Sequence, residues 1–120
     1  MISVVIPTFE RPTLLERAIS SILIQNYNTL EILVINDSVN EAPVIEVINK
    51  LNDCRIKYFK NERKPGGNGA RNTGILRAKG ELIAFLDDDD EWYPTKLYEQ
   101  RKYLQSTSCR GIGGVYCGFE

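Results

Sequence analysis

The stretch ISVVIPTFERPTLLERAISSIL, residues 2–23, decides the fold. It opens with the apolar run Ile2 to Ile6, which Pro7 ends, and a short continuous run of this kind is typical of a strand covered on both faces. Pro12 then stands where the first turn of a helix tolerates proline. Apolar residues recur after it at helical spacing: Leu14, Leu15, Ala18, Ile19, Ile22 and Leu23. The stretch therefore predicts a strand, a turn and a helix.

The same alternation continues along the chain. Further strands are predicted at 31–36, 56–59, 81–86 and 114–119, and further helices from Pro43, from about Ala70 to Lys79 with Gly80 as its C-terminal cap, and from Pro94. The segment NERKPGGNG, residues 61–69, is too rich in glycine and proline for regular structure and is predicted to be a loop. This alternation, with short connections, indicates an α/β fold: a Rossmann-like, mostly parallel sheet with helices on both faces.

Composition removes several classes of function. The chain has 120 residues, 15 Lys and Arg against 16 Asp and Glu, and a net charge of -1, so it lacks the basic field that binds nucleic acid. It has no histidine, and its three cysteines are widely spaced, which excludes catalytic triads and argues against zinc sites and disulfide frameworks. No apolar run is long enough to span a bilayer and no signal peptide is evident, so a cytoplasmic location is expected.

In a sheet of this kind, ligands bind beyond the carboxyl ends of the strands, where the strand order reverses. The residues that directly follow each predicted strand are therefore the candidates for a site. They are Pro7, Thr8, Phe9 and Glu10 after the first strand, Asp37 after the second, the glycine-rich segment with Arg71 after the third, and Asp87 to Asp90 after the fourth.

The fourth of these segments is FLDDDDEWYP, residues 85–94, in which four aspartates follow a strand. Adjacent carboxylates repel one another unless a cation offsets the repulsion, and Mg²⁺ or Mn²⁺ prefers such hard oxygen ligands while it also holds substrate phosphates. The alternative is a solvated acidic turn beside the N-terminus of the next helix. That alternative accounts for Asp90 and Glu91 as well as a cation does, but it does not require Asp87 to Asp89.

Two other candidates stay open on the sequence alone. Asp37 stands where a carboxylate in nucleotide-binding sheets reaches a ribose or base, but aspartate also ends strands because it makes good turns. The segment GGNGARNTG, residues 66–74, matches neither the dinucleotide fingerprint nor the phosphate-binding loop. Arg71, placed in the first turn of the following helix, can meet a phosphate, a base carbonyl or one of the aspartates.

Taken in order, the segments 2–27, 30–38 and 69–97 resemble the nucleotide-binding half of the family 2 glycosyltransferases, which have the GT-A fold. The resemblance covers about residues 2–105. It implies metal-dependent transfer of a sugar, usually with inversion, from a nucleotide-diphosphate sugar to a hydroxyl of a saccharide, lipid or protein acceptor. A UDP-sugar is the first candidate for the donor.

The resemblance also implies roles for the strand ends. Pro7, Thr8, Phe9 and Glu10 would line the base and ribose pocket, and Asp37 would accept a hydrogen bond from the base. Asp87 to Asp89 match the acidic D-x-D signature. Asp89, with Asp87 beside it, would ligate Mn²⁺ or Mg²⁺, and Asp87 and Asp88 would reach the ribose or metal-bound water. Trp92 and Pro94 match the stretch that packs the next helix under the site.

Members of this family are longer than this chain, and their acceptor half carries the catalytic base. Nothing after Trp92 supplies such a base convincingly, because Glu99 lies on a predicted surface helix and Glu120 is terminal. We therefore expect residues 1–120 to be a single donor-binding domain, truncated before the acceptor half, which binds nucleotide and metal weakly and transfers nothing by itself. The full-length protein would be cytoplasmic or peripheral at the inner face of the membrane. The predicted strand 114–119 would leave an unpaired edge for self-association.

Two other classes of protein share part of this pattern. A nucleotidyltransferase also combines aspartates, a metal and an α/β sheet, but it would carry a glycine-rich basic signature after the first strand, where this chain has PTFERP. A noncatalytic nucleotide- or metal-binding domain, such as a phospho-acceptor receiver, would place paired acids after the first strand and a lone aspartate after the third. Thr8, Phe9 and Glu10 hold the first of these places, and Lys60 and Asn61 the second.

Overall fold

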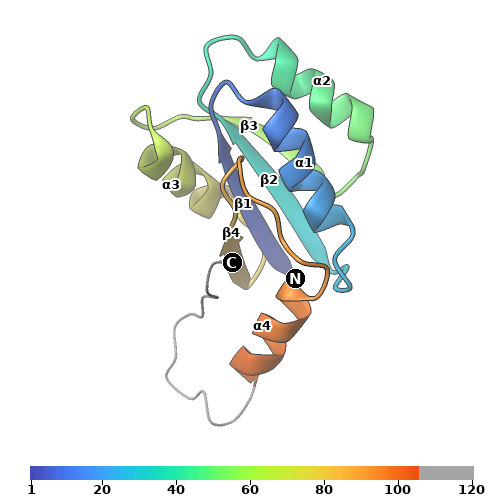
Figure 1. Ribbon diagram of the computed structural model, residues 1–120. Helices are drawn as coiled ribbons and strands as arrows, with labels where there is room; N and C mark the ends of the chain where they lie inside the picture. Colours follow the sequence, from blue (N-terminus) through green and yellow to red (C-terminus); the bar gives the residue numbers. More distant parts are fainter. Residues whose placement is uncertain (106–120) are drawn as a thin grey trace.

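The computed structural model describes residues 1–105, in which strands and helices alternate (Figure 1). The elements are β1 (Ile2–Thr8), α1 (Pro12–Leu23), β2 (Leu30–Asn36), α2 (Ala42–Leu51), β3 (Ile56–Lys60), α3 (Gly67–Arg77), β4 (Leu82–Phe85) and α4 (Lys96–Gln105). The predicted strand 114–119 and the self-association expected from it lie outside the described residues. None of the helices in the described part is long and apolar enough to cross a membrane.

The four strands form one sheet in the order β3-β2-β1-β4, and each neighbouring pair is parallel. Val4 of β1 lies opposite Ile32 of β2 on one side and Ala84 of β4 on the other. The chain first adds strands on one side of β1 and then returns to its other side, so the strand order reverses between β1 and β4. Sheets of this type bind their ligands at such a switch point.

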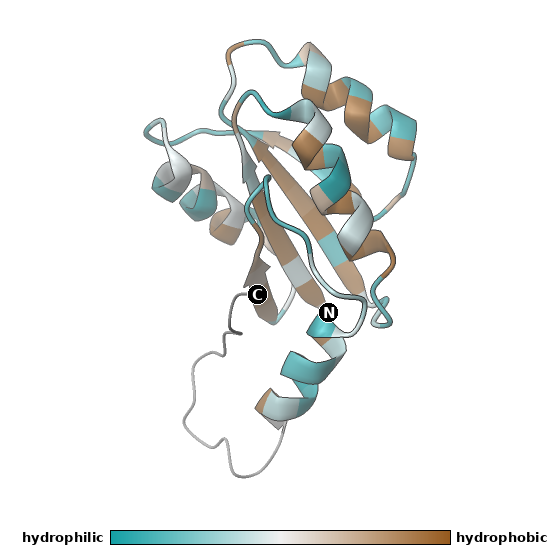
Figure 2. Ribbon diagram, viewed as in Figure 1, coloured by the Kyte–Doolittle hydropathy of each residue, from teal (hydrophilic) through white to brown (hydrophobic). Residues whose placement is uncertain are grey.

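Helices cover both faces of the sheet, as predicted. Helices α1 and α2 lie on one face and α3 lies on the other (Figure 1). Ile6 packs with α1 and α2, whereas Val5 packs on the opposite side with Ala70 of α3, because successive residues of a strand point to opposite faces. Strands β1 and β2 are apolar along most of their length (Figure 2) and are buried throughout, which is the pattern of strands covered on both faces. The edge strands β3 and β4 are partly exposed.

Strand β1 does not end before Pro7, as the sequence suggested, but continues through it to Thr8. The carbonyl of Val5 accepts a hydrogen bond from Leu86, so the backbone groups of Val5 face β4, and those of Pro7, two residues later, face the same side. The pairing of β1 with β4 has ended there, since its last pair is Val5 with Phe85. The missing N–H of Pro7 therefore costs no ladder hydrogen bond, and the two strands part at this point.

Three other predicted boundaries were wrong by two or more residues. Helix α3 begins at Gly67, inside the segment predicted to be a loop, and α4 begins at Lys96 instead of Pro94. Gly80 does not cap α3, which ends in an extended residue, Ala78, with φ -67° and ψ 136°. Glycine is needed at position 80 for space, because a Cβ there would stand 2.6 Å from the carbonyl oxygen of Met1. The expected packing of Trp92 is confirmed, since it is buried in the core that also contains Leu97 of α4.

At the end of the sheet opposite the switch point, a buried carboxylate links neighbouring strands. Glu31 of β2 is 3% exposed, and it accepts hydrogen bonds from Ser3 Oγ (2.6 Å), Lys57 Nζ (2.8 Å) and the backbone N–H of Lys79 (2.8 Å). Burial by itself raises the pKa of Glu31, but the hydrogen bonds from Lys57, Ser3 and Lys79 outweigh burial, and the net pKa is lowered. The ionised form is therefore the one that the fold stabilises.

This lowered pKa predicts how stability depends on pH. The contribution of Glu31 to the free energy of unfolding is fully present above its unfolded pKa of about 4.3, and it is lost as the pH falls through the lower folded pKa. Between about pH 5 and pH 3 the melting temperature of the wild type should therefore fall more steeply than that of Glu31→Gln. The control is Glu81→Gln, whose carboxylate is 80% exposed and should leave the wild-type slope unchanged. Equal slopes in the wild type and Glu31→Gln would contradict the prediction.

Candidate functional site

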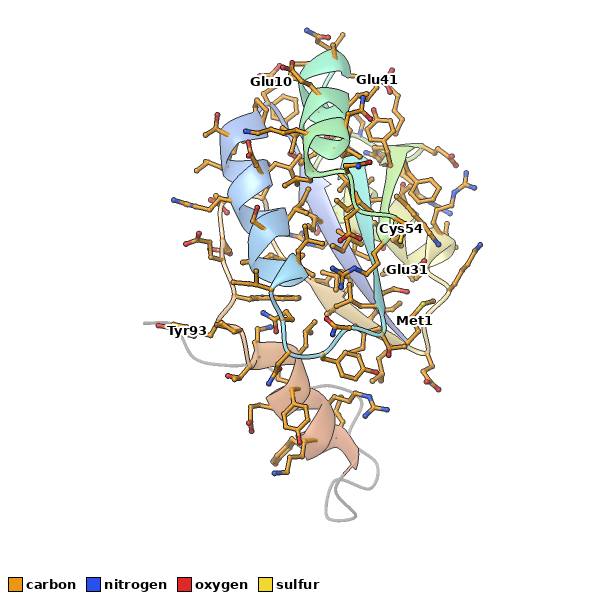
Figure 3. The ribbon with its side chains drawn as sticks, turned by 90° about the vertical axis from the view of Figure 1, so that its right-hand side faces the viewer. Met1, Glu10, Glu31, Glu41, Cys54 and Tyr93 are labelled. Carbon is orange, nitrogen blue, oxygen red and sulfur yellow. The ribbon has the colours of Figure 1, made fainter. Side chains whose placement is uncertain are left out.

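The predicted site residues lie along one rim of the sheet, at the carboxyl ends of β1, β2 and β4. Thr8 ends β1 opposite Asn36, which ends β2, and Asp87 to Asp90 follow β4 on the other side of β1. Glu10 and Glu41 lie at this end of the sheet, and Met1 lies toward its other end (Figure 3). The rim therefore brings together side chains from positions 8 to 90 of the chain.

The four aspartates form a tight turn, in which the N–H of Asp90 donates to the carbonyl oxygen of Asp87 at 3.1 Å. The turn gathers Asp87, Asp89 and Asp90, each of which offers one carboxylate oxygen within 4.8 Å of the others. Asp87 and Asp89 were the predicted metal ligands, and Asp90 is the third member of the cluster, which the sequence alone left between a helix cap and a ligand. Three hard oxygen donors at this spacing fit Mg²⁺ or Mn²⁺.

The crowding of carboxylates in this turn affects the pKa of Asp90. The pKa of Asp90 is raised, first by burial and then by the charges of Asp89, Asp87 and Asp88. A carboxyl whose neighbours disfavour its ionised form gains when a cation arrives, because the cation offsets both the desolvation and the repulsion. Asp90 therefore adds to the attraction of this turn for positive charge.

Asp88 points away from its three neighbours into the protein. It is 6% exposed, and its Oδ2 accepts hydrogen bonds from Thr8 Oγ1 at 3.0 Å and from the backbone N–H of Phe9 at 3.2 Å. Its Oδ1 accepts from Arg11 Nη1 at 3.4 Å. Asp88 thus joins the turn after β4 to the turn after β1 across the switch point.

Two arginines occupy the outer carboxylates of the turn. Arg11 Nη1 lies 3.1 Å from Asp89 Oδ2, and Arg71 Nη2 lies 3.0 Å from Asp87 Oδ1. Of the partners that the sequence left open for Arg71, the structure thus shows an aspartate. The sequence analysis missed Arg11, although it stands within the PTFERP segment. Exposed ion pairs of this kind contribute only about 0–1 kcal/mol each, so a cation or a phosphate can replace them.

Asp37 lies at the middle of the rim and holds the glycine-rich segment in place. Its N–H donates to the carbonyl oxygen of Thr8 at 2.9 Å. Its carboxylate accepts from Asn61 Nδ2 at 2.8 Å and from the N–H of Gly66 at 2.7 Å. Sequence reasoning missed Asn61, although the rule that selected Asp37, a polar residue directly after a strand, would also have selected Asn61 after β3.

The four residues after the first predicted strand separate into two pairs. Pro7 and Thr8 are buried within β1, and the hydroxyl of Thr8 is engaged by Asp88. Phe9 is 53% exposed, and the exposed Glu10 has a left-handed φ of 52°, while its N–H donates to Ser38 Oγ at 2.8 Å. Phe9 and Glu10 therefore present their side chains to solvent at the rim, whereas Pro7 and Thr8 set the path of the backbone that carries them.

Comparisons with known proteins find a matching family and several relatives. The model of the family described as Glycosyl transferase family 2 matches residues 3–117. A Campylobacter jejuni protein named GalNAc(5)-diNAcBac-PP-undecaprenol beta-1,3-glucosyltransferase is 47% identical over 93 residues, which are 75% of this chain and 30% of the relative. An Escherichia coli protein named UDP-Glc:alpha-D-GlcNAc-diphosphoundecaprenol beta-1,3-glucosyltransferase WfgD is 38% identical over 116 residues, 97% of this chain and 46% of the relative. The chain thus spans about a third to a half of the length of these two relatives.

Solved structures show the same fold. A mannosyltransferase from Pyrobaculum calidifontis in complex with GDP-Man and Mn²⁺ has a TM-score of 0.77 at 24% identity, over 88% of this chain and 32% of that one. Residues 1–349 of S. aureus TarS in complex with UDP have a TM-score of 0.74 at 24% identity, over 86% of this chain and 31% of that one. These likenesses confirm the expected α/β fold of the GT-A type.

Proposed function

Because the chain belongs to glycosyl transferase family 2, we propose that it supplies the donor-binding part of an enzyme that transfers a sugar from a nucleotide-diphosphate sugar to an acceptor hydroxyl. The observation that carries this proposal is the cluster of Asp87, Asp89 and Asp90 at the switch point between β1 and β4. A parallel sheet places its ligand there, and three adjacent carboxylates suit a ligand that arrives with a divalent cation.

Asp87, Asp89 and Asp90 are the residues that would hold Mn²⁺ or Mg²⁺. When bound, such a cation supplies the positive charge that stabilises a diphosphate as its bond to the sugar breaks. Asp87 and Asp89 would release Arg71 and Arg11 to hold the cation, since both ion pairs are partly exposed and weak. The two guanidinium groups stay at the rim, where they can pair with phosphate oxygens.

The nucleoside would lie along the rim toward β2. Phe9 and Glu10 present side chains to solvent beside the acidic turn, and Asp37 follows β2. Asp37 would accept a hydrogen bond from the base in exchange for one of its present donors, Asn61 or Gly66. We propose a UDP-sugar as the donor, because the name of one relative specifies UDP-Glc.

The acceptor, the outcome at the sugar carbon and the location are also proposals. Both relatives described above have names that specify an acceptor on a diphosphate-linked undecaprenol, which supports a saccharide acceptor carried by a lipid. A lipid-linked acceptor supports a cytoplasmic protein that works at the inner face of the membrane. We propose transfer with inversion, in which a base from the acceptor-binding part removes the proton of the acceptor hydroxyl.

The base is proposed to lie outside residues 1–120, in keeping with the greater length of the relatives. Sugar transfer from UDP-Glc should therefore be undetectable with this chain and measurable with a longer parent protein that contains it. Robust transfer by the 120-residue chain would refute the proposal that the base lies outside residues 1–120. Nucleotide binding by the longer protein without any transfer to lipid-linked saccharides would favour a noncatalytic nucleotide-binding domain instead.

The donor-binding role itself is tested by calorimetric titration of the chain with UDP, GDP and TDP, each with and without Mn²⁺. We expect UDP to bind best, and we expect Mn²⁺ to tighten its binding by at least about tenfold, or about 1.4 kcal/mol, because the acidic turn repels an uncompensated diphosphate. A UDP affinity that does not change when Mn²⁺ is removed would contradict the role of Asp87, Asp89 and Asp90. If GDP or TDP binds more tightly than UDP, the donor-binding role stands and the proposed UDP-sugar is replaced by a GDP- or TDP-sugar.

A further inference from the structure

We infer that Asp88 is a positioning residue, whose buried carboxylate fixes the turn after β1 to the turn after β4 and so sets where Phe9 and Arg11 stand at the donor site. The inference rests on the proposed function, because it assigns a role within the same site. It differs from the role that the family resemblance implied for Asp88, which was to reach the ribose or metal-bound water.

The bonding of Asp88 favours positioning over ligand binding. Its carboxylate is 6% exposed and already accepts three hydrogen bonds, from Thr8 Oγ1, the N–H of Phe9 and Arg11 Nη1. Thr8 is itself only 3% exposed. If Asp88 turned outward to a ligand, it would leave the hydroxyl of Thr8 and the N–H of Phe9 without this acceptor, and a buried donor that loses its partner is costly.

The turn after β1 needs such an acceptor on its β4 side, because the sheet holds the end of β1 only from β2, where the N–H of Asp37 donates to the carbonyl oxygen of Thr8. The ladder between β1 and β4 ends at Val5, and Pro7 has no N–H to extend it. Glu10 then adopts a φ of 52°, a left-handed conformation that is unfavourable for a residue with a side chain. Backbone conformations of this kind persist where the surroundings fix them.

The turn is held from both sides by side chains of the neighbouring strand ends. Ser38, which follows β2, accepts from the N–H of Glu10 at 2.8 Å, and Asp88, which follows β4, accepts from the N–H of Phe9 at 3.2 Å. Arg11 is held by the same aspartate and also reaches Asp89. Asp88 therefore determines how Phe9 and Arg11 are presented beside the acidic cluster.

The test compares Asp88→Asn with Asp88→Ala in an NMR titration of the 120-residue chain with UDP in the presence of Mg²⁺, a method that also measures weak binding. Both substitutions remove the same charge and the contact with Arg11, which keeps its pair with Asp89. The asparagine amide oxygen can still accept from Thr8 and from the N–H of Phe9. We expect Asp88→Ala to weaken UDP binding by about tenfold, or about 1.4 kcal/mol, and Asp88→Asn by less than about threefold. The amide of Phe9 should exchange slowly with solvent in the wild type and Asp88→Asn, and fast in Asp88→Ala.

A double-mutant cycle with Thr8→Val locates the effect in the contact itself. Thr8→Val removes one of the two hydrogen bonds that uncharged donors make to Asp88, and it should weaken UDP binding by about threefold in the wild type. It should have little further effect in Asp88→Ala, because residues that act through one contact are not additive. Thr8→Ser keeps the hydroxyl and should restore the wild-type affinity. Melting temperatures of all the variants separate local displacement from unfolding.

The outcomes distinguish this inference from the proposed function. If the wild type binds UDP but Asp88→Asn loses as much affinity as Asp88→Ala, the charge of Asp88 acts directly and the positioning role is overturned. Additive effects of Thr8→Val and Asp88→Ala would overturn it as well. If the wild type binds no UDP with either Mg²⁺ or Mn²⁺, the proposed donor site is wrong and the inference falls with it.

Discussion

Asp89→Asn is expected to remove most of the gain in UDP affinity that Mn²⁺ provides, which is a loss of at least about tenfold, or about 1.4 kcal/mol. The substitution replaces one of the three clustered carboxylates with a neutral amide, and Mn²⁺ and Mg²⁺ depend on charged oxygen ligands at such sites. The melting temperature of Asp89→Asn should change little or increase. The Asp89 side chain is 47% exposed and its ion pair with Arg11 is weak, whereas its charge contributes to the repulsion that raises the pKa of Asp90.

The measurement for Asp89→Asn is UDP calorimetry with and without Mn²⁺, together with the melting temperature. The matched control is Glu91→Gln, which removes a neighbouring carboxylate that pairs with Arg17 at 3.3 Å and does not belong to the cluster. Glu91→Gln should keep the response to Mn²⁺. If Asp89→Asn keeps it too, the cation is held elsewhere, and the proposed use of the acidic turn is refuted.

Gly74→Ala is expected to destabilise the protein strongly, although alanine is the better helix former. Gly74 is buried in α3 where the helix crosses β1, and a Cβ at this position would lie 2.3 Å from Val5 Cγ1 and 2.9 Å from Val5 Cγ2. The gain in helix propensity is about 1 kcal/mol. Overpacking in a core costs about 1–3 kcal/mol, and occasionally more. Because Val5 is fully buried in the central strand and has no room to move, we expect the upper part of this range and a net loss of about 2 kcal/mol.

Chemical denaturation of Gly74→Ala measures this loss, and two variants show where it arises. Gly67→Ala makes the same substitution in the same helix, but its Cβ would meet only the flexible end of Arg71, at 3.1 Å, so stability should change little. Val5→Ala combined with Gly74→Ala should be more stable than the sum of the two single losses predicts, since each change relieves the other. A Gly74→Ala protein as stable as the wild type would show that α3 does not pack on β1 this closely.

Much of the fold could be predicted from the sequence because its signals are local. The run Ile2 to Ile6 predicts a strand covered on both faces, and the spacing of apolar residues after Pro12 predicts a helix, without any knowledge of partners. The boundaries that failed depend on distant neighbours. Pro7 could remain in β1 only because β4 departs there, and Gly80 is required by the approach of Met1, which lies far from it in the sequence.

The candidate site could be predicted only in part, for a related reason. The rule that ligands lie beyond the ends of parallel strands selected Asp37 and the acidic run, because that rule needs only the order of the elements. It did not reveal that Arg11 pairs with Asp89 or that Asn61 holds Asp37. Such contacts join segments that are up to 78 residues apart, and they depend on strand order and register.

The sequence by itself determined that four carboxylates stand at the end of an apolar strand in an α/β chain of family 2 glycosyltransferase type. Four identical letters cannot show which way each side chain points. Only the tertiary structure decided that Asp88 turns inward to Thr8 and Phe9 while Asp87, Asp89 and Asp90 gather at the rim. The physical reason is the tight turn, which aims successive side chains in different directions, together with the end of β1, where the buried hydroxyl of Thr8 and the N–H of Phe9 need an acceptor.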